Sequence, residues 1–249
     1  MTADIRALWY RSWLETHRPF RIGFMMMIAL GFGLFMQYPG SPGTEFPHGA
    51  LAVGVAQVRA LPHDLRSYVW LRWFGNTLIL WWPIMALFVA GTGVSTPAYL
   101  LSLPVRRRTV VGICVAAGLL ELVAATLLST LIVWAGWHFR ADEHYPLREA
   151  LAHSALMMGG GLGFYGFFVL LAAALGERDK LIAGIGFLFL YGMLTFLVDG
   201  FRRYSLLRVM TGDTYFFRGE IPWIGLAASL AVAAVMISAS VRLIERRDY

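Results

Sequence analysis

Long stretches without a charged residue constrain the fold of this chain more than any other feature. A helix rises 1.5 Å per residue, so roughly 20 apolar residues are needed to cross about 30 Å of hydrocarbon. Six stretches between charged residues approach or exceed that length, one of them interrupted only by Glu121. They run from Ile22 to about Tyr38, Phe74 to about Pro104, Thr109 to Phe139, Ala150 to Gly176, Leu181 to Val198 and Ile221 to Val241. The sequence therefore predicts an all-α membrane protein, a six-transmembrane-helix bundle.

The composition supports a membrane protein with a single domain. Hydrophobic residues make up 58% of the chain and charged residues 14%, whereas soluble domains are about 25% charged. We therefore expect residues 22–249 to form one transmembrane domain.

The residues before the first apolar stretch have an amphipathic pattern. On a helical wheel the charged residues share one narrow face, and the apolar residues occupy the broad opposite side. Segment 1–21 is therefore predicted to be an amphipathic helix at the membrane surface that leads into the first span. The alternative is a short helix that packs on its own protein. The charged residues are Asp4, Arg11, Glu15 and Arg18, and the apolar residues are Ile5, Trp9, Trp13 and Leu14.

Basic residues in the short connections predict the orientation of the bundle. With the N-terminus inside, 12 of the 21 basic residues lie on the cytoplasmic side, so both termini are expected there. The connection between the fifth and sixth spans, with four arginines, argues against this bias. The cytoplasmic set is Arg6, Arg11, Arg18, Arg21, Arg106, Arg107, Arg108, Arg178, Lys180, Arg242, Arg246 and Arg247.

Several classes of function lack the residues that they need. The formal charge of +6 does not indicate nucleic-acid binding, because the arginines are grouped between apolar stretches, as orientation signals are. No GxxxxGK[ST] phosphate loop occurs, and Lys180 is the only lysine. HExxH, GxSxG and zinc-spaced Cys/His sets are also missing, and Cys114 is the only cysteine. We expect no catalytic, cofactor-binding or metal-binding residues in this chain and no enzymatic activity of its own.

The connection between the second and third spans reads LLSLPVRRRTVVG from Leu100 to Gly112. A proline interrupts the end of one helix, three arginines follow, and a new apolar helix begins. Taken alone, the pattern is also that of a positive-inside anchor with a turn.

This stretch resembles the cytoplasmic connection between helices two and three in permease subunits of ABC-2 type ABC transporters. Leu103, Pro104, Val105, Arg106 and Arg107 match its Leu-Pro-Val/Leu-Ser-Arg pattern, with arginine where the family often has serine. Segment 1–21 resembles the elbow helix of the family. The ending Arg242, Glu245, Arg246, Arg247, Asp248 and Tyr249 resembles its basic-acidic tail.

The resemblance implies a homodimer or heterodimer of permease subunits in the bacterial inner (cytoplasmic) membrane, most of whose relatives are exporters. A separate ABC ATPase subunit would hold the ATP and Mg²⁺. The resemblance assigns ATPase coupling to Leu103, Pro104, Val105, Arg106, Arg107 and Arg108, and elbow-helix contact to Arg11, Glu15 and Arg18.

Glu121 is the candidate pathway residue, because an ionisable group inside a membrane span is costly unless it is paired or protonated. It fits a substrate-pathway or proton-coupling carboxylate; the alternatives are a structural hydrogen bond to a neighbouring helix and a position nearer the membrane interface. Two other functions therefore stay open: a proton-coupled secondary transporter that uses Glu121, and a non-transporting membrane assembly subunit.

Three further patterns concern packing. Gly159 and Gly163 have the GxxxG spacing that lets helix backbones approach closely. His153, near the start of the fourth span, is expected at the headgroup level. Most tryptophans lie near predicted span ends, which is typical of interfacial anchors. They are Trp70, Trp73, Trp81, Trp82, Trp134, Trp137 and Trp223.

Overall fold

The computed structural model describes residues 2–36, 65–92, 106–140, 145–175 and 177–246. Within these ranges the chain is helical and contains no strand. The long helices are α1 (Thr2–Met36), α6 (Arg107–Arg140), α7 (Leu147–Ala174), α8 (Glu177–Leu197) and α12 (Trp223–Glu245). A further long helix consists of α3 (Leu65–Val69), the π-helix η1 (Trp70–Leu78) and α4 (Ile79–Thr92). Three short helices precede α12: α9 (Asp199–Tyr204), α10 (Leu206–Thr211) and α11 (Asp213–Arg218).

Among the described residues, five helices are long and apolar enough to cross a membrane: Leu65–Ala90, Arg107–Phe139, Leu147–Ala174, Arg178–Leu197 and Trp223–Glu245. The apolar part of α1, Phe20–Leu34, is shorter. The chain is thus an all-α bundle whose apolar helices fit a multi-pass membrane protein. The count of six spans stays a prediction, with α1 as the sixth candidate.

The first helix differs in one respect from the expected elbow. Residues 2–21 are helical, but they continue without a break into the apolar part of α1. Leu8 packs against Val110, Ile113 and Cys114 at the start of α6. This part of α1 therefore contacts its own bundle, and its placement on the membrane surface stays a prediction.

The second long helix begins earlier than the uncharged stretch that starts at Phe74. It begins at Leu65 and carries Arg66 and Arg72 in its first turns. Arg66 Nε lies 2.7 Å from the Glu149 carboxylate at the start of α7, so a helix from elsewhere in the chain supplies its counter-charge. Residues 93–104, the end of that stretch, lie outside the described ranges.

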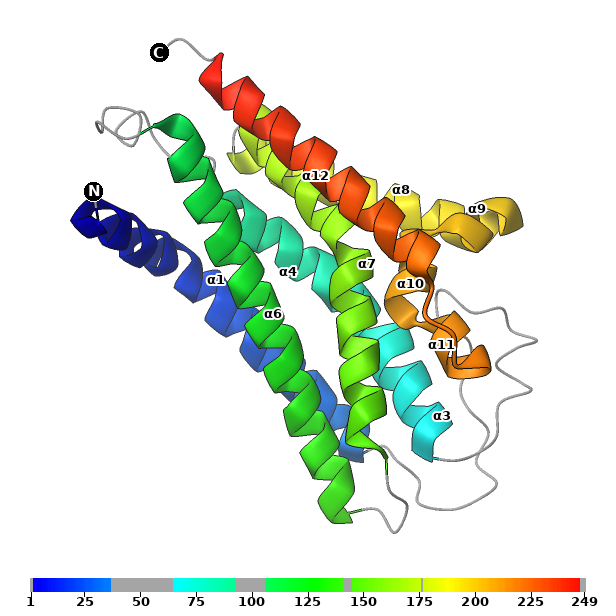
Figure 1. Ribbon diagram of the computed structural model, residues 1–249. Coiled ribbons are helices and arrows are strands. Elements are labelled where there is room, and N and C mark those ends of the chain that lie inside the picture. The colour runs from blue at the N-terminus through cyan, green and yellow to red at the C-terminus, as the bar shows by residue number, and fades with distance from the viewer. Residues whose placement is uncertain (1, 37–64, 93–105, 141–144, 176, 247–249) are drawn as a thin grey trace.

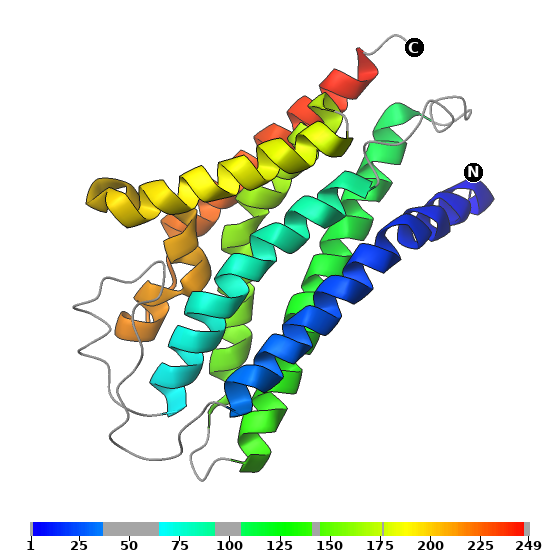
Figure 2. The same cartoon turned by 180° about the vertical axis from the view of Figure 1, so that it is seen from behind.

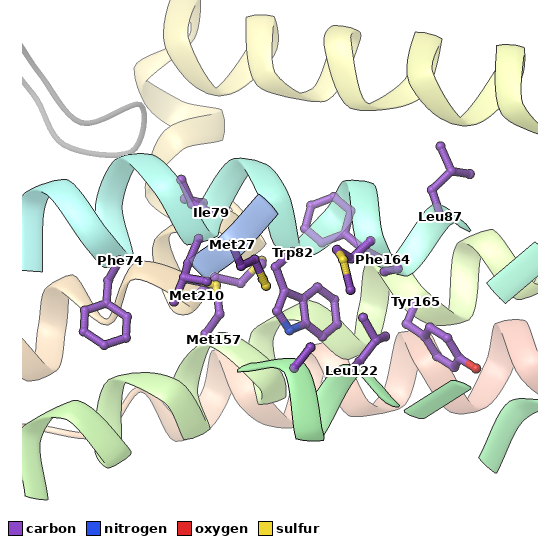
Figure 3. Close-up of a cluster of buried hydrophobic side chains, with 14 of the residues drawn as sticks. Met27, Phe74, Ile79, Trp82, Leu87, Leu122, Met157, Phe164, Tyr165 and Met210 are labelled. Atoms are coloured by element: carbon purple, nitrogen blue, oxygen red, sulfur yellow. The ribbon is translucent and has the colours of Figure 1, made fainter. Parts of the chain in front are cut away.

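Several tryptophans expected at the membrane surface lie in the core instead. Trp70, Trp73, Trp82 and Trp137 are at most 2% exposed, whereas Trp223 is 70% exposed and its role as an interfacial anchor stays a prediction. Figure 3 shows Trp82 among Met27, Leu122 and Phe164 in the main hydrophobic cluster. Its indole N–H donates to Thr126 Oγ1 at 3.1 Å, which satisfies the buried donor.

Glycines bring α7 close to α12, and the two helices run side by side (Figure 1). A Cβ on Gly166 would lie 2.7 Å from the Cα atom of Ala233, and one on Gly163 would lie 3.3 Å from Ser229 Oγ. Ser229 Oγ donates to the Gly160 carbonyl at 2.8 Å and accepts from the Gly163 N–H at 2.9 Å. These small residues therefore serve packing within one chain.

The segment after α8 returns along α7. Leu206 lies against Gly163, Met210 against Gly160, and Gly212 against His153, so α10 runs antiparallel to α7. Figures 1 and 2 show α10 and α11 beside the half of α7 that begins at Leu147. We call this pair of short helices the α10–α11 cap.

Candidate functional site

One end of the bundle brings together three segments that the sequence singled out. The N-terminal part of α1, the start of α6 and the C-terminal end of α12 all lie at that end (Figures 1 and 2). We call it the arginine end and define it by residues 6–14, 106–113 and 242–246. Arg106 precedes α6, and its carbonyl accepts from the Thr109 N–H at 2.8 Å, so the arginine cluster lies on the first turn of the helix.

Two of the arginines bind α12. Arg107 Nη1 donates to the Ile244 carbonyl at 3.1 Å. Arg108 forms an ion pair with Glu245, with Nη2 3.1 Å from Oε2 and a second contact from Nε to Oε1. Positive charge is unfavourable at a helix N-terminus and favourable at a C-terminus. The contacts with the end of α12 therefore offset the unfavourable position of the arginines at the start of α6.

The predicted coupling and elbow residues are only partly described. Arg106 and Arg108 are exposed, and Arg107 is partly buried. Leu103, Pro104 and Val105 lie outside the described residues. Arg11 is partly buried on α1, and the side chains of Glu15 and Arg18 are outside the described set.

Glu121 lies inside the bundle on α6, with 7% of its surface exposed. Other polar groups of α6 form hydrogen bonds with α7. Tyr165 OH on α7 donates to the Val115 carbonyl at 2.8 Å, and Ser154 Oγ lies 3.0 Å from Thr130 Oγ1. Glu121 is thus a buried carboxyl group on the helix that carries the arginine cluster.

Among the described residues, no three His, Cys, Asp or Glu side chains are grouped closely enough to hold a metal ion.

His153 is fully buried by its own bundle, and its position at the headgroup level stays a prediction. Its ring centroid lies 5.0 Å from that of Phe74, 5.3 Å from that of Tyr215 and 6.3 Å from that of Phe216. The α10–α11 cap therefore closes over this histidine.

Aromatic and charged contacts fasten the cap to the bundle. Trp70 stacks on Phe216 with ring centroids 4.3 Å apart, and its indole N–H donates to the Thr211 carbonyl at 3.0 Å. The Arg66 guanidinium carbon lies 4.8 Å from the centroid of the Phe216 ring. Sequence reasoning missed this cluster, because Trp70 and Thr211 are 141 residues apart.

Asp213 is the buried acid of the cap, with 4% exposure. Burial raises its pKa to about 6, although the Thr211 hydroxyl donates to the carboxylate and Arg208 lies 3.7 Å away. The desolvation of the charged form outweighs both partners.

An apolar pocket of about 380 Å³ opens between α4 and α8. Phe88, Phe164, Phe189 and Tyr191 are among its lining residues. The Tyr191 hydroxyl accepts from the Leu206 N–H at 2.8 Å, and this hydrogen bond helps to hold the start of α10.

No protein-family model matches this chain, and the comparisons with curated proteins and with solved structures give no significant match either.

Proposed function

We propose that this chain is the permease subunit of an ABC-2 type ABC transporter. It would pair with a second permease subunit, identical or different, and form the translocation pathway in the bacterial inner membrane. A separate ATPase subunit on the cytoplasmic side would bind ATP and Mg²⁺ and drive export. The observation that carries the proposal is the arginine end, where the described parts of the segments that resemble the family's elbow helix, coupling connection and tail lie together.

The contacts at the arginine end give the proposal a mechanical basis. Leu8 on α1 packs against α6, and Arg107 and Arg108 bind the end of α12. A force applied by an ATPase to the connection before α6 would therefore reach three helices. Packed elements that have two discrete arrangements can transmit such a shift to a distant pathway.

The decisive experiment is co-purification of an ATPase subunit from native membranes in mild detergent. Arg106→Glu is the best single change, because Arg106 is exposed and Arg107 and Arg108 are engaged with α12. The matched control is Arg203→Glu, an exposed arginine on α9. We expect the wild type and the control to retain the ATPase in a fixed ratio and Arg106→Glu to lose most of it, with membrane insertion unchanged. Equal retention by all three proteins would remove the coupling assignment.

The burial of Glu121 favours a second candidate, a proton-coupled secondary transporter. That function requires transport without any ATPase and its loss in Glu121→Gln. A third candidate, a non-transporting assembly subunit, would tolerate Glu121→Gln. Purification of a homogeneous complex without an ATPase would favour the secondary transporter or the assembly subunit over the permease. The effect of Glu121→Gln on transport would then distinguish these two functions.

A further inference from the structure

The outward side of α12 carries a ridge whose composition changes along its length. Ala234, Ser238, Arg242 and Arg246 follow one another at intervals of four residues and so share one face of the helix. We call these four residues the α12 ridge. All four are exposed, and α12 lies at the outside of the bundle (Figure 1). Near the middle of α12 the side chains of the ridge are small and nearly apolar, and at the arginine end the ridge carries two positive charges.

A shallow depression that is open to the surroundings lies along this ridge. Its lining consists of the ridge and of Val235, Ala239 and Leu243, the next row of the same helix. Small side chains at Ala234, Ser238 and Ala239 leave the space, and the two arginines border one end of it. Such a shape suits an elongated ligand with an apolar body and an anionic head.

The two arginines of the ridge are available to a ligand. Glu245, the carboxylate at this end of α12, pairs with Arg108 on α6, and neither Arg242 nor Arg246 pairs with a carboxylate of the described residues. The last carbonyls of α12 would repel an anion. Arg107 offsets that repulsion, because its guanidinium donates to the Ile244 carbonyl.

We propose that the α12 ridge binds an anionic phospholipid. The phosphate lies between Arg242 and Arg246, and an acyl chain lies over Ala234 and Ser238. A lipid satisfies both halves of the surface at once, because basic side chains at the end of a membrane span attract anionic headgroups and the adjoining apolar face is in contact with hydrocarbon. The inference requires only that α12 spans a membrane, so it is independent of the proposed transport function.

Native mass spectrometry of the delipidated full-length protein tests the proposal, with dioleoylphosphatidylglycerol as the probe and dioleoylphosphatidylcholine as the neutral reference. We expect Arg242→Gln with Arg246→Gln to weaken binding of the anionic lipid by about thirtyfold, which corresponds to roughly 2 kcal/mol at about 1 kcal/mol per basic residue. Binding of the neutral lipid should be unchanged.

The matched control is Arg178→Gln with Arg203→Gln, two exposed arginines on α8 and α9 whose removal changes the net charge equally. It should retain the affinity for the anionic lipid. An equal loss in both double variants would overturn the proposal, because the attraction would then be a property of the total charge. Displacement of the lipid by an equal concentration of inorganic phosphate would also overturn it, since the apolar part of the ridge would then contribute nothing.

A second copy of the chain is the other possible occupant of this face, and a separate measurement addresses it. In a Cys114→Ala background, Ser238→Cys should remain monomeric on oxidation in native membranes if lipid covers the ridge. Efficient disulfide-linked dimers through Ser238→Cys would assign the ridge to a protein interface and overturn the lipid site.

Discussion

At the scale of single residues, Gly212 is the position in the α10–α11 cap that tolerates a side chain least. Its φ is +67°, a conformation that side chains disfavour, and a Cβ there would lie 2.8 Å from His153 Nδ1 and 2.9 Å from Leu156 Cδ1. Gly219 has a similar φ of +71° but nothing within 4 Å of its Cβ position. The two glycines therefore separate backbone strain from crowding.

We expect Gly219→Ala to destabilise the protein by roughly 1 kcal/mol, the cost of a left-handed residue with a side chain. Gly212→Ala should cost about 3 kcal/mol, because overpacking against His153 adds to the same strain. Thermal unfolding of both variants in one detergent measures the difference. Equal losses would show that the cap moves away from His153 without cost.

Asp213 predicts a dependence of stability on pH. Its pKa is about 6 in the folded protein and 3.8 for the free side chain, so the folded state binds the proton more tightly. The stability contributed by this group is therefore fully present below pH 3.8 and is lost as the pH rises toward 6, by an amount on the order of 2–3 kcal/mol.

The Asp213→Asn variant should lose that component, because its amide does not titrate. Unfolding midpoints of the wild type and the variant, measured from pH 4 to pH 7, should differ in slope below pH 6 and run parallel above it. Parallel curves over the whole range would mean that Asp213 titrates normally and is hydrated in solution.

At the scale of helices, the seam between α7 and α12 depends on glycine at its closest point. Gly166→Ala should destabilise the protein by about 2 kcal/mol, because the new methyl group would meet the backbone of Ala233 at 2.7 Å. Gly186→Ala on α8 is the matched control, with nothing within 4 Å of its Cβ position. It should stabilise by up to about 1 kcal/mol through higher helix propensity. Denaturation in mixed micelles measures both, and a neutral Gly166→Ala would contradict the close packing.

The elements show which parts of the structure are readable from the sequence. The long apolar helices follow from runs of adjacent residues, so their approximate positions could be predicted. The helical continuation through Arg66 could not, since its partner Glu149 is 83 residues away. The same limit applies to the burial of Trp70 and Trp82, because hydropathy does not distinguish a core tryptophan from one at a membrane surface.

The candidate site follows the same division. The arginine cluster is visible in the sequence as a charge pattern between two apolar stretches. Its attachment to α12 is not, because Arg108 and Glu245 are 137 residues apart and each is an ordinary charged residue beside a span. His153 and Asp213 also carried no signal of burial, since the cap that covers His153 comes from a later part of the chain.

At the scale of the whole molecule, the positions of α1, α6 and α12 place three basic segments at one end of the bundle. Arg108 and Glu245 connect the start of α6 with the end of the last helix, so that end is also held together mechanically. An ATPase can engage it only from the cytoplasm. The orientation of the bundle is therefore the property on which the proposed function depends most directly.

Two aspartates near opposite ends of α8 measure that orientation. Asp179 is exposed at the start of α8, and the Asp199 side chain is 93% exposed just beyond its end. Each is replaced by cysteine in a Cys114→Ala background, which removes the buried native thiol. With a membrane-impermeant maleimide we expect Asp199→Cys to react in intact cells and Asp179→Cys to react only after lysis, because Arg178 and Lys180 at the start of α8 belong to the predicted cytoplasmic set. The reverse pattern would place the arginine end outside, where no ATPase can reach it, and would leave the proton-coupled transporter and the assembly subunit as the remaining functions.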